Sequence, residues 1–165
     1  MKINDLFNVE NKVAVVTGGS RGIGEMITAG FLANGVKVYI SARKAPALIE
    51  KANELSEKYE AECIAIPCDL STSEGIDEFY NSVEKNESGI DFLINNAGAA
   101  WGEPLESFSE KGWDKVMDLN VKSIFFLTQK FKNLLLQKAT ESDPSRIINI
   151  GSIDGLNVPS METYS

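Results

Sequence analysis

A glycine-rich turn near the start of the chain has the composition of a phosphate-binding loop. Residues 17–24 read Thr-Gly-Gly-Ser-Arg-Gly-Ile-Gly and directly follow the apolar residues 13–16, which are typical of a buried strand. Glycines let the backbone turn tightly and let an anion come close, and a helix that begins there presents free N–H groups to it. The spacing is Gly-x-x-x-Gly-x-Gly rather than the Gly-x-Gly-x-x-Gly of most dinucleotide-binding loops. Such turns also serve only to reverse a chain, but the position between a strand and a helix favours a pyrophosphate site.

The residue inventory limits the chemistry that the chain can perform. Histidine is absent, which excludes Ser-His-Asp and Cys-His nucleophilic catalysis and leaves no imidazole ligand for a catalytic zinc. Proton transfer must therefore use Tyr, Lys, Asp, Glu or water. Cys63 and Cys68 are five residues apart on one expected strand and its exit, so they should face opposite sides of the sheet. We expect two reduced structural thiols and no metal site.

Length and composition are typical of one globular domain. The chain has 165 residues, of which 43% are hydrophobic and 24% charged, enough for a single core. A net charge of −8 without a basic stretch argues against a nucleic-acid partner. No apolar run reaches the length of a membrane span, and residues 1–5 lack the apolar core of a signal peptide. These features predict a cytoplasmic protein with no membrane partner.

Strand-like and helix-like segments alternate along the whole chain. Strands are expected at residues 12–17, 36–41, 62–67, 90–95 and 146–150, and the first two helices at residues 22–33 and 46–59. Capping boxes formed by Ser71 with Glu74 and by Ser107 with Glu110 should open the third and fourth helices, which end near Gly89 and Lys138. Such alternation specifies right-handed crossovers and a parallel, doubly wound α/β sheet. The expected strand order is 3-2-1-4-5, with the ligand crevice at the carboxyl ends of the first and fourth strands.

Five features in order give the sequence a resemblance to the standard branch of the short-chain dehydrogenase/reductase family. They are residues 17–24, Cys68-Asp69-Leu70, Asn95-Asn96-Ala97-Gly98, Asn120 and Gly151-Ser152, and they span essentially the whole chain. The chain looks most like the bacterial 3-oxoacyl-[acyl-carrier-protein] reductases, in particular those of the rhamnolipid pathway. The resemblance implies an NAD(P)-binding Rossmann domain over residues 1–165 that forms the N-terminal part of a longer, homo-oligomeric reductase, a dimer or a tetramer. The C-terminal strands of the family's sheet would then be lacking from this chain.

The resemblance also assigns roles to residues of the expected crevice. It implies that the glycine loop, the exit of the third strand and the turn after the fourth strand bind the cofactor through Gly18, Ser20, Arg21, Gly22, Ile23, Gly24, Asp69, Leu70, Asn96, Ala97 and Gly98. It makes Ser152 the residue that hydrogen-bonds the substrate carbonyl, and it makes Asn120 the residue that orients a backbone carbonyl and a water leading to a catalytic Lys.

Structural alternatives stand beside three of these roles. Asp69 could serve only as a turn or helix-capping residue, because Ser71 follows it. Asn95 and Asn96 could satisfy the loop backbone instead of a ligand. Asn120 could be a satisfied core amide, since we expect it within the stripe of Trp113, Met117, Ile124 and Thr128 that packs on the sheet.

The end of the second strand indicates which cofactor the crevice prefers. Enzymes that use NAD usually place an acid there to bind the ribose 2′-hydroxyl, whereas Ser41-Ala42-Arg43-Lys44 is followed by no acid until Glu50. Arg43 offers a planar charged group for a 2′-phosphate, and Arg21 can approach the same phosphate. The alternative is that both arginines are solvated surface residues. The missing acid favours NADP(H) over NAD(H).

The family pattern is incomplete at the end of the chain. The sequence stops at Tyr164-Ser165, before any Tyr-x-x-x-Lys is completed. Tyr164 stands twelve residues after Ser152, slightly short of the commonest family spacing, so a tyrosine just beyond residue 165 is the favoured proton donor. We expect the 165-residue chain alone to be inactive and to expose residues 146–150 as an apolar sheet edge.

Three functions from different classes fit these observations. The first is an NADP(H)-dependent carbonyl reductase or alcohol dehydrogenase, with a small carbonyl compound or an acyl thioester as substrate. The second is a non-catalytic dinucleotide-binding module that senses redox state, and the third is a binder of some other phosphate ligand. A sensor needs neither Asn120 nor Ser152, and the asparagine-rich turn at residues 95–96 argues against the third. The sequence therefore favours the enzyme.

Overall fold

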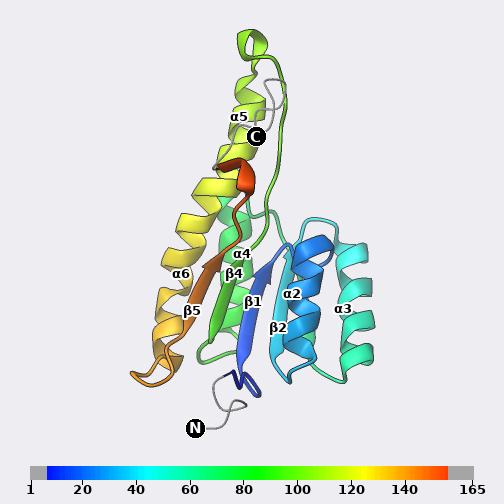
Figure 1. The fold of residues 1–165 in the computed structure, drawn as a ribbon, viewed down its shortest axis with the longest axis vertical. Coiled ribbons are helices and arrows are strands. Elements are labelled where there is room, and N and C mark those ends of the chain that lie inside the picture. Colours follow the sequence, from blue (N-terminus) through cyan, green and yellow to red (C-terminus); the bar gives the residue numbers. More distant parts are fainter. Residues whose placement is uncertain (1–6, 156–165) are drawn as a thin grey trace.

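The computed structural model describes residues 7–155 and contains a five-stranded parallel sheet of order β3-β2-β1-β4-β5 (Figure 1). The strands are β1 (Val13–Thr17), β2 (Lys37–Ala42), β3 (Cys63–Pro67), β4 (Phe92–Asn95) and β5 (Arg146–Asn149). Every neighbouring pair runs parallel. The predicted doubly wound fold and its strand order are confirmed, while Tyr164 lies outside the described residues.

Helices cover both faces of the sheet, and each face has its own core. The helices are α2 (Gly22–Leu32), α3 (Ala45–Tyr59), α4 (Ser73–Glu84), α5 (Glu110–Met117) and α6 (Ser123–Lys138). On one face, Val16 and Ile40 pack with Leu32 of α2 and Leu48 of α3. The core of the other face combines side chains of the sheet, α4 and α6, namely Val15, Tyr39, Leu93, Phe79 and Phe131. Because alternate residues of a strand point to opposite faces, strands with two apolar faces must be covered twice.

The two cysteines follow this alternation. Cys63 packs in the core beneath α2 and α3, and Cys68 packs in the core beneath α4 and α6. Both thiols are free and buried, and burial raises the pKa of each to about 12. The predicted opposite orientation is confirmed, and neither sulfur carries the thiolate charge that nucleophilic chemistry requires.

Polar contacts fix the amino ends of the central strands. The Asp91 carboxylate accepts a hydrogen bond from Val13 N at 2.9 Å and lies 3.7 Å from Lys12 Nζ. Lys12 also pairs with Asp143, in the loop that leads into β5. β1, β4 and β5 are therefore tied together at the end of the sheet opposite the glycine loop, which leaves their carboxyl ends for a ligand.

Both predicted capping boxes are wrong, because local contacts divert the serines. Thr72 caps α4 by accepting from Gly75 N at 3.0 Å, while the Ser71 hydroxyl donates to the Asp69 carboxylate at 2.7 Å. Ser107 lies in a short 3₁₀ turn (Leu105–Ser107), so Ser109 caps α5 instead. In each case a turn before the helix moves its first residue further along the chain than the sequence spacing suggests.

The long fourth helix is interrupted by a π-helical turn (Asp118–Lys122) between α5 and α6. A π turn contains one more residue than an α turn, so it shifts the angular position of every side chain that follows. The stripe that packs on the sheet is Ser123, Leu127, Phe131 and Leu134. The stripe predicted through Trp113 and Asn120 is therefore wrong, and Trp113 is 60% exposed.

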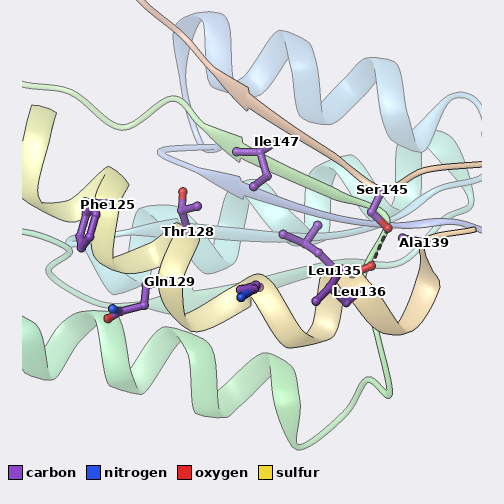
Figure 2. Close-up of a pocket in the computed structure, with 9 residues that line it drawn as sticks. Phe125, Thr128, Gln129, Leu135, Leu136, Ala139, Ser145 and Ile147 are labelled. Carbon is purple, nitrogen blue, oxygen red and sulfur yellow. Dashed lines mark hydrogen bonds between the residues drawn. The ribbon is translucent and has the colours of Figure 1, made fainter.

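The outer strand β5 presents an apolar edge, as predicted. Within residues 7–155 it pairs only with β4, and Ile147 and Ile148 are 44% and 43% exposed. Between β5 and α6 lies an apolar pocket of about 330 Å³, whose lining includes Phe125, Leu136 and Ile147 (Figure 2). Ser145 closes one end by donating to the Leu135 carbonyl at 2.8 Å. Among its lining residues only Lys132 is charged, so the pocket offers little acid–base chemistry.

Two glycines of α2 provide a matched test of the packing. A Cβ at Gly24 would lie 2.2 Å from the Gly18 carbonyl oxygen, whereas one at Gly30 would meet no described atom within 4 Å. We expect Gly24→Ala to destabilise the protein by about 1–3 kcal/mol. Gly30→Ala should stabilise it by about 0.5–1 kcal/mol, because alanine loses less conformational entropy in a helix.

Urea unfolding, followed by circular dichroism, measures both changes from the transition midpoints. Equal effects of the two substitutions would contradict the close approach of α2 to the glycine loop.

Candidate functional site

The Thr17 hydroxyl joins the carboxyl ends of β1 and β4. It accepts hydrogen bonds from Asn96 N and Ala97 N, each at 2.9 Å, and donates to the Ile94 carbonyl at 3.3 Å. A hydroxyl has one donor and two acceptor positions, so the group uses its full capacity. Thr17 is 1% exposed, and its contacts set the path of the chain as it leaves β4.

The Asn96 side chain extends this connection to the glycine loop. Its Nδ2 donates to the Thr17 carbonyl at 2.9 Å and to the Gly18 carbonyl at 3.3 Å. Gly18 has a φ of +65°, a conformation that favours glycine. The carboxamide therefore satisfies loop backbone, which is the structural alternative considered for Asn96. Ala97 backs the same loop, since a Cβ at Gly18 would lie 3.1 Å from Ala97 Cα.

The N-terminus of α2 has no side-chain cap. Its N-cap residue, Arg21, has extended backbone and makes no side-chain cap. Gly22 has a φ of +56°, and a Cβ there would meet no described atom within 4 Å. Together with the partly exposed Ser20 and the exposed Ile23, this turn presents backbone N–H groups without a capping side chain, an arrangement that binds anions.

Two arginines follow neighbouring strand ends beside this helix terminus. Thr17 of β1 pairs with Ser41 of β2 in the sheet. Arg21 lies four residues after Thr17 and Arg43 two residues after Ser41, so both arginines follow the same edge of the sheet. Both arginines are exposed, and neither arginine forms an ion pair within residues 7–155. The adjoining Lys44 is the N-cap residue of α3 and is exposed as well.

The residues that follow β3 form a turn held by the Asp69 side chain. The Asp69 Oδ1 atom accepts from Ser71 N at 3.0 Å and from Ser71 Oγ at 2.7 Å. Leu70 is 4% exposed and its side chain packs in the core beneath α4 and α6. The structure therefore directs the Leu70 side chain away from solvent, so that only its backbone is left to face a ligand.

Asn120 lies on the π-helical turn and holds the backbone of Ala99 at both polar atoms. Ala99 N donates to Asn120 Oδ1, and Asn120 Nδ2 donates to the Ala99 carbonyl, each at 2.8 Å. A Cβ at Gly98 would lie 3.6 Å from Asn120 Oδ1. The side chain is thus neither a sheet-facing core amide nor free, because it fixes the segment that leaves β4.

The end of β5 is tied to the end of β4 by a second amide pair. Asn95 Nδ2 donates to Asn149 Oδ1 at 2.8 Å, and Ile150 N donates to the Asn95 carbonyl at 2.9 Å. Ser152 follows this pair, is exposed, and accepts from Gly155 N through its carbonyl at 3.1 Å. The serine therefore emerges at the same edge of the sheet as the glycine loop.

The sequence interpretation missed two contacts, one at the end of β1 and one in the segment that follows β4. Thr17 was treated only as the first residue of the glycine loop. A polar residue at the end of an apolar strand was the sequence signal that could have indicated its structural role. Trp101 packs on α5, where a Cβ at Gly112 would lie 2.3 Å from its ring, and Lys115 Nζ lies 4.4 Å from the ring centroid. No sequence pattern indicated that second contact.

Within residues 7–155 no group of three or more Cys, Asp or Glu side chains could hold a metal ion. None of the helices described there is both long and apolar enough to cross a membrane.

Comparison with known proteins agrees with this geometry. Over 159 residues the chain is 42% identical to the rhamnolipids biosynthesis 3-oxoacyl-[acyl-carrier-protein] reductase of Pseudomonas aeruginosa, covering 96% of this chain and 61% of the relative. It is 35% identical to dehydrogenase/reductase SDR family member 11 of Gallus gallus, covering 89% of this chain and 57% of the relative. The chain thus spans about three fifths of the length of these relatives.

Solved structures show the same architecture. The Pseudomonas aeruginosa RhlG/NADP active-site complex superposes with a TM-score of 0.90 at 43% identity, covering 96% of this chain and 61% of that one. L-sorbose reductase from Gluconobacter frateurii, complexed with NADPH and L-sorbose, superposes with a TM-score of 0.86 at 29% identity, covering 94% and 57%. Residues 12–165 also match the sequence pattern of the short chain dehydrogenase family. On these grounds the chain belongs to the short-chain dehydrogenase family.

Proposed function

We propose that this chain is the N-terminal, cofactor-binding part of a longer NADP(H)-dependent reductase that interconverts a carbonyl group and a secondary alcohol. The observation that carries the proposal is the pair of unpaired arginines, Arg21 and Arg43, beside the open N-terminus of α2. The lengths of the relatives, of which the chain covers 61% and 57%, support a longer parent protein.

The charge at the end of β2 supports NADP(H) over NAD(H). A carboxylate there would bind a ribose 2′-hydroxyl and repel a 2′-phosphate, but no acid occurs between Ser41 and Glu50. Guanidinium groups bind phosphate through two parallel hydrogen bonds. A relative of this chain and a more distant one were solved with NADP and NADPH respectively, which is consistent with the same preference.

The glycine loop fits the pyrophosphate of such a cofactor. Gly24 lets α2 approach the Gly18 carbonyl within a distance that any Cβ would prevent, and Gly22 leaves space open at the helix terminus. The N–H groups of the first turn would bind the pyrophosphate, while Asp69 and the segment at Asn96 would lie beside the adenosine and the nicotinamide halves. When bound, the cofactor would supply the hydride that is exchanged with the carbonyl carbon.

Polar groups at the ends of β4 and β5 would serve the substrate. The Ser152 hydroxyl would donate a hydrogen bond to the substrate carbonyl and so stabilise the charge that develops on its oxygen. Asn120 would hold the Ala99 carbonyl in place as part of the path that moves a proton. The relative named as a 3-oxoacyl-[acyl-carrier-protein] reductase, 42% identical, favours a 3-oxoacyl thioester as the substrate.

Replacement of Arg43 tests the cofactor preference. Arg43→Asp should reverse it in the full-length protein, because a carboxylate repels the 2′-phosphate and can bind a 2′-hydroxyl. We expect a loss of about 1–3 kcal/mol in NADPH binding, measured by fluorescence titration of NADPH and NADH. Lys85→Asp, the same charge change at the C-cap of α4, is the control and should leave the ratio of the two affinities unchanged. An unaltered ratio in Arg43→Asp would contradict the proposed cofactor site.

Replacement of Ser152 tests the catalytic role. In the full-length protein Ser152→Ala should lower kcat about 100- to 1,000-fold, as removal of an oxyanion donor does, while NADPH affinity stays within a factor of about two. Steady-state assays on a 3-oxoacyl thioester, combined with NADPH titration, separate the two effects. Ser142→Ala, at an exposed position before β5, is the matched control. A large loss of NADPH binding would show that Ser152 serves the nucleotide instead of the substrate.

A further inference from the structure

Glu25 is the acidic residue placed most directly to interfere with Arg21. It stands four residues after Arg21, and its backbone N donates to the Arg21 carbonyl at 3.2 Å, so the two residues lie one helical turn apart. It also lies in the first turn of α2, next to the backbone groups that would receive the pyrophosphate. A carboxylate in this position threatens anion binding in two ways, by occupying the guanidinium and by repelling the phosphate.

The structure shows Glu25 bound to a different cation. Lys51 of α3 places its Nζ 3.0 Å from Glu25 Oε1 and 2.6 Å from Glu54 Oε2. The Glu25 and Lys51 side chains are only 33% and 23% exposed, so the pair is partly shielded between α2 and α3. The pKa of Lys51 is raised by its hydrogen bonds to Glu54 and to Glu25, which keeps the ammonium charged.

The pairing leaves Arg21 without an ionic partner in the part of the chain that the structure describes. A guanidinium that is already paired with a carboxylate must lose that partner before it can bind a phosphate, whereas an unpaired one loses only water. Lys51 also offsets the charge of Glu25, which would otherwise act on a doubly charged phosphate across the short first turn of the helix.

We propose that Lys51 is a specificity-determining residue for the 2′-phosphate, because it holds Glu25 away from Arg21. Lys51 acts through Glu25 and needs no contact with the nucleotide. The inference rests on the proposed function, since it concerns the selectivity of the same site.

The test compares a 2′-phosphorylated ligand with its unphosphorylated counterpart. Dissociation constants of 2′,5′-ADP and 5′-AMP are measured by isothermal titration calorimetry on the full-length protein at low ionic strength. In Lys51→Met the affinity for 2′,5′-ADP should fall about 5-fold, while that for 5′-AMP should change less than about 2-fold. The double variant Lys51→Met with Glu25→Gln should recover the original affinity for 2′,5′-ADP, because the competing carboxylate is gone.

Two further variants separate this role from a structural one. Lys58→Met removes the same charge from the same helix without touching Glu25, and it should leave both affinities unchanged. Glu25→Gln alone should bind 2′,5′-ADP at least as tightly as the original protein, and this holds as a test even where Lys51→Met does not fold.

The proposal is overturned if Lys51→Met retains its full preference for 2′,5′-ADP, if the double variant does not recover it, or if Glu25→Gln alone weakens 2′,5′-ADP binding. A failure of the proposed function is distinguishable from these results. In that case the original protein itself would bind 2′,5′-ADP and 5′-AMP with equal affinity.

Discussion

The carboxyl edge of the sheet depends on one buried hydroxyl group. Thr17 Oγ1 ties the last residues of β1 to the first turn after β4 through three hydrogen bonds. Thr17 is 1% exposed, and loss of its hydroxyl would leave the N–H groups of Asn96 and Ala97 without this acceptor. Asn96 then reaches the Gly18 carbonyl, against which α2 packs through Gly24. The positions of the loops at this edge therefore follow from contacts within the fold.

The distribution of charge also bears on which ligand this edge of the sheet can bind. The chain carries a net charge of −8, and several cations away from this edge are paired with acids, among them Lys12 with Asp91 and Lys37 with Glu87. Arg21 and Arg43 are left without such partners among the described residues. Unpaired guanidinium groups in an acidic protein create a local positive field, which attracts an anionic ligand to that place. The selectivity of the site thus depends on which acids are kept away as well as on which cations are present.

Local patterns in the sequence predicted the fold well. The apolar runs gave the five strands within two residues at each end, and their alternation with helices gave the strand order. The cap of α4 could not be predicted, because the Ser71 hydroxyl donates to the Asp69 carboxylate in the turn before the helix. The π-helical turn at Asp118–Lys122 leaves no mark in the hydrophobic pattern, so the buried stripe of α6 was misassigned. The hydrogen-bond partners of Thr17 could not be predicted either, since they lie 79 and 80 residues further along the chain.

A crystal structure of the full-length protein with NADP⁺ bound tests the account most directly. We expect the pyrophosphate at the N-terminus of α2 and the 2′-phosphate within hydrogen-bonding distance of the guanidinium groups of both Arg21 and Arg43. A 2′-phosphate that contacts neither arginine, or a nucleotide bound in the pocket between α6 and β5, would contradict the assignment of this edge as the NADP(H) site.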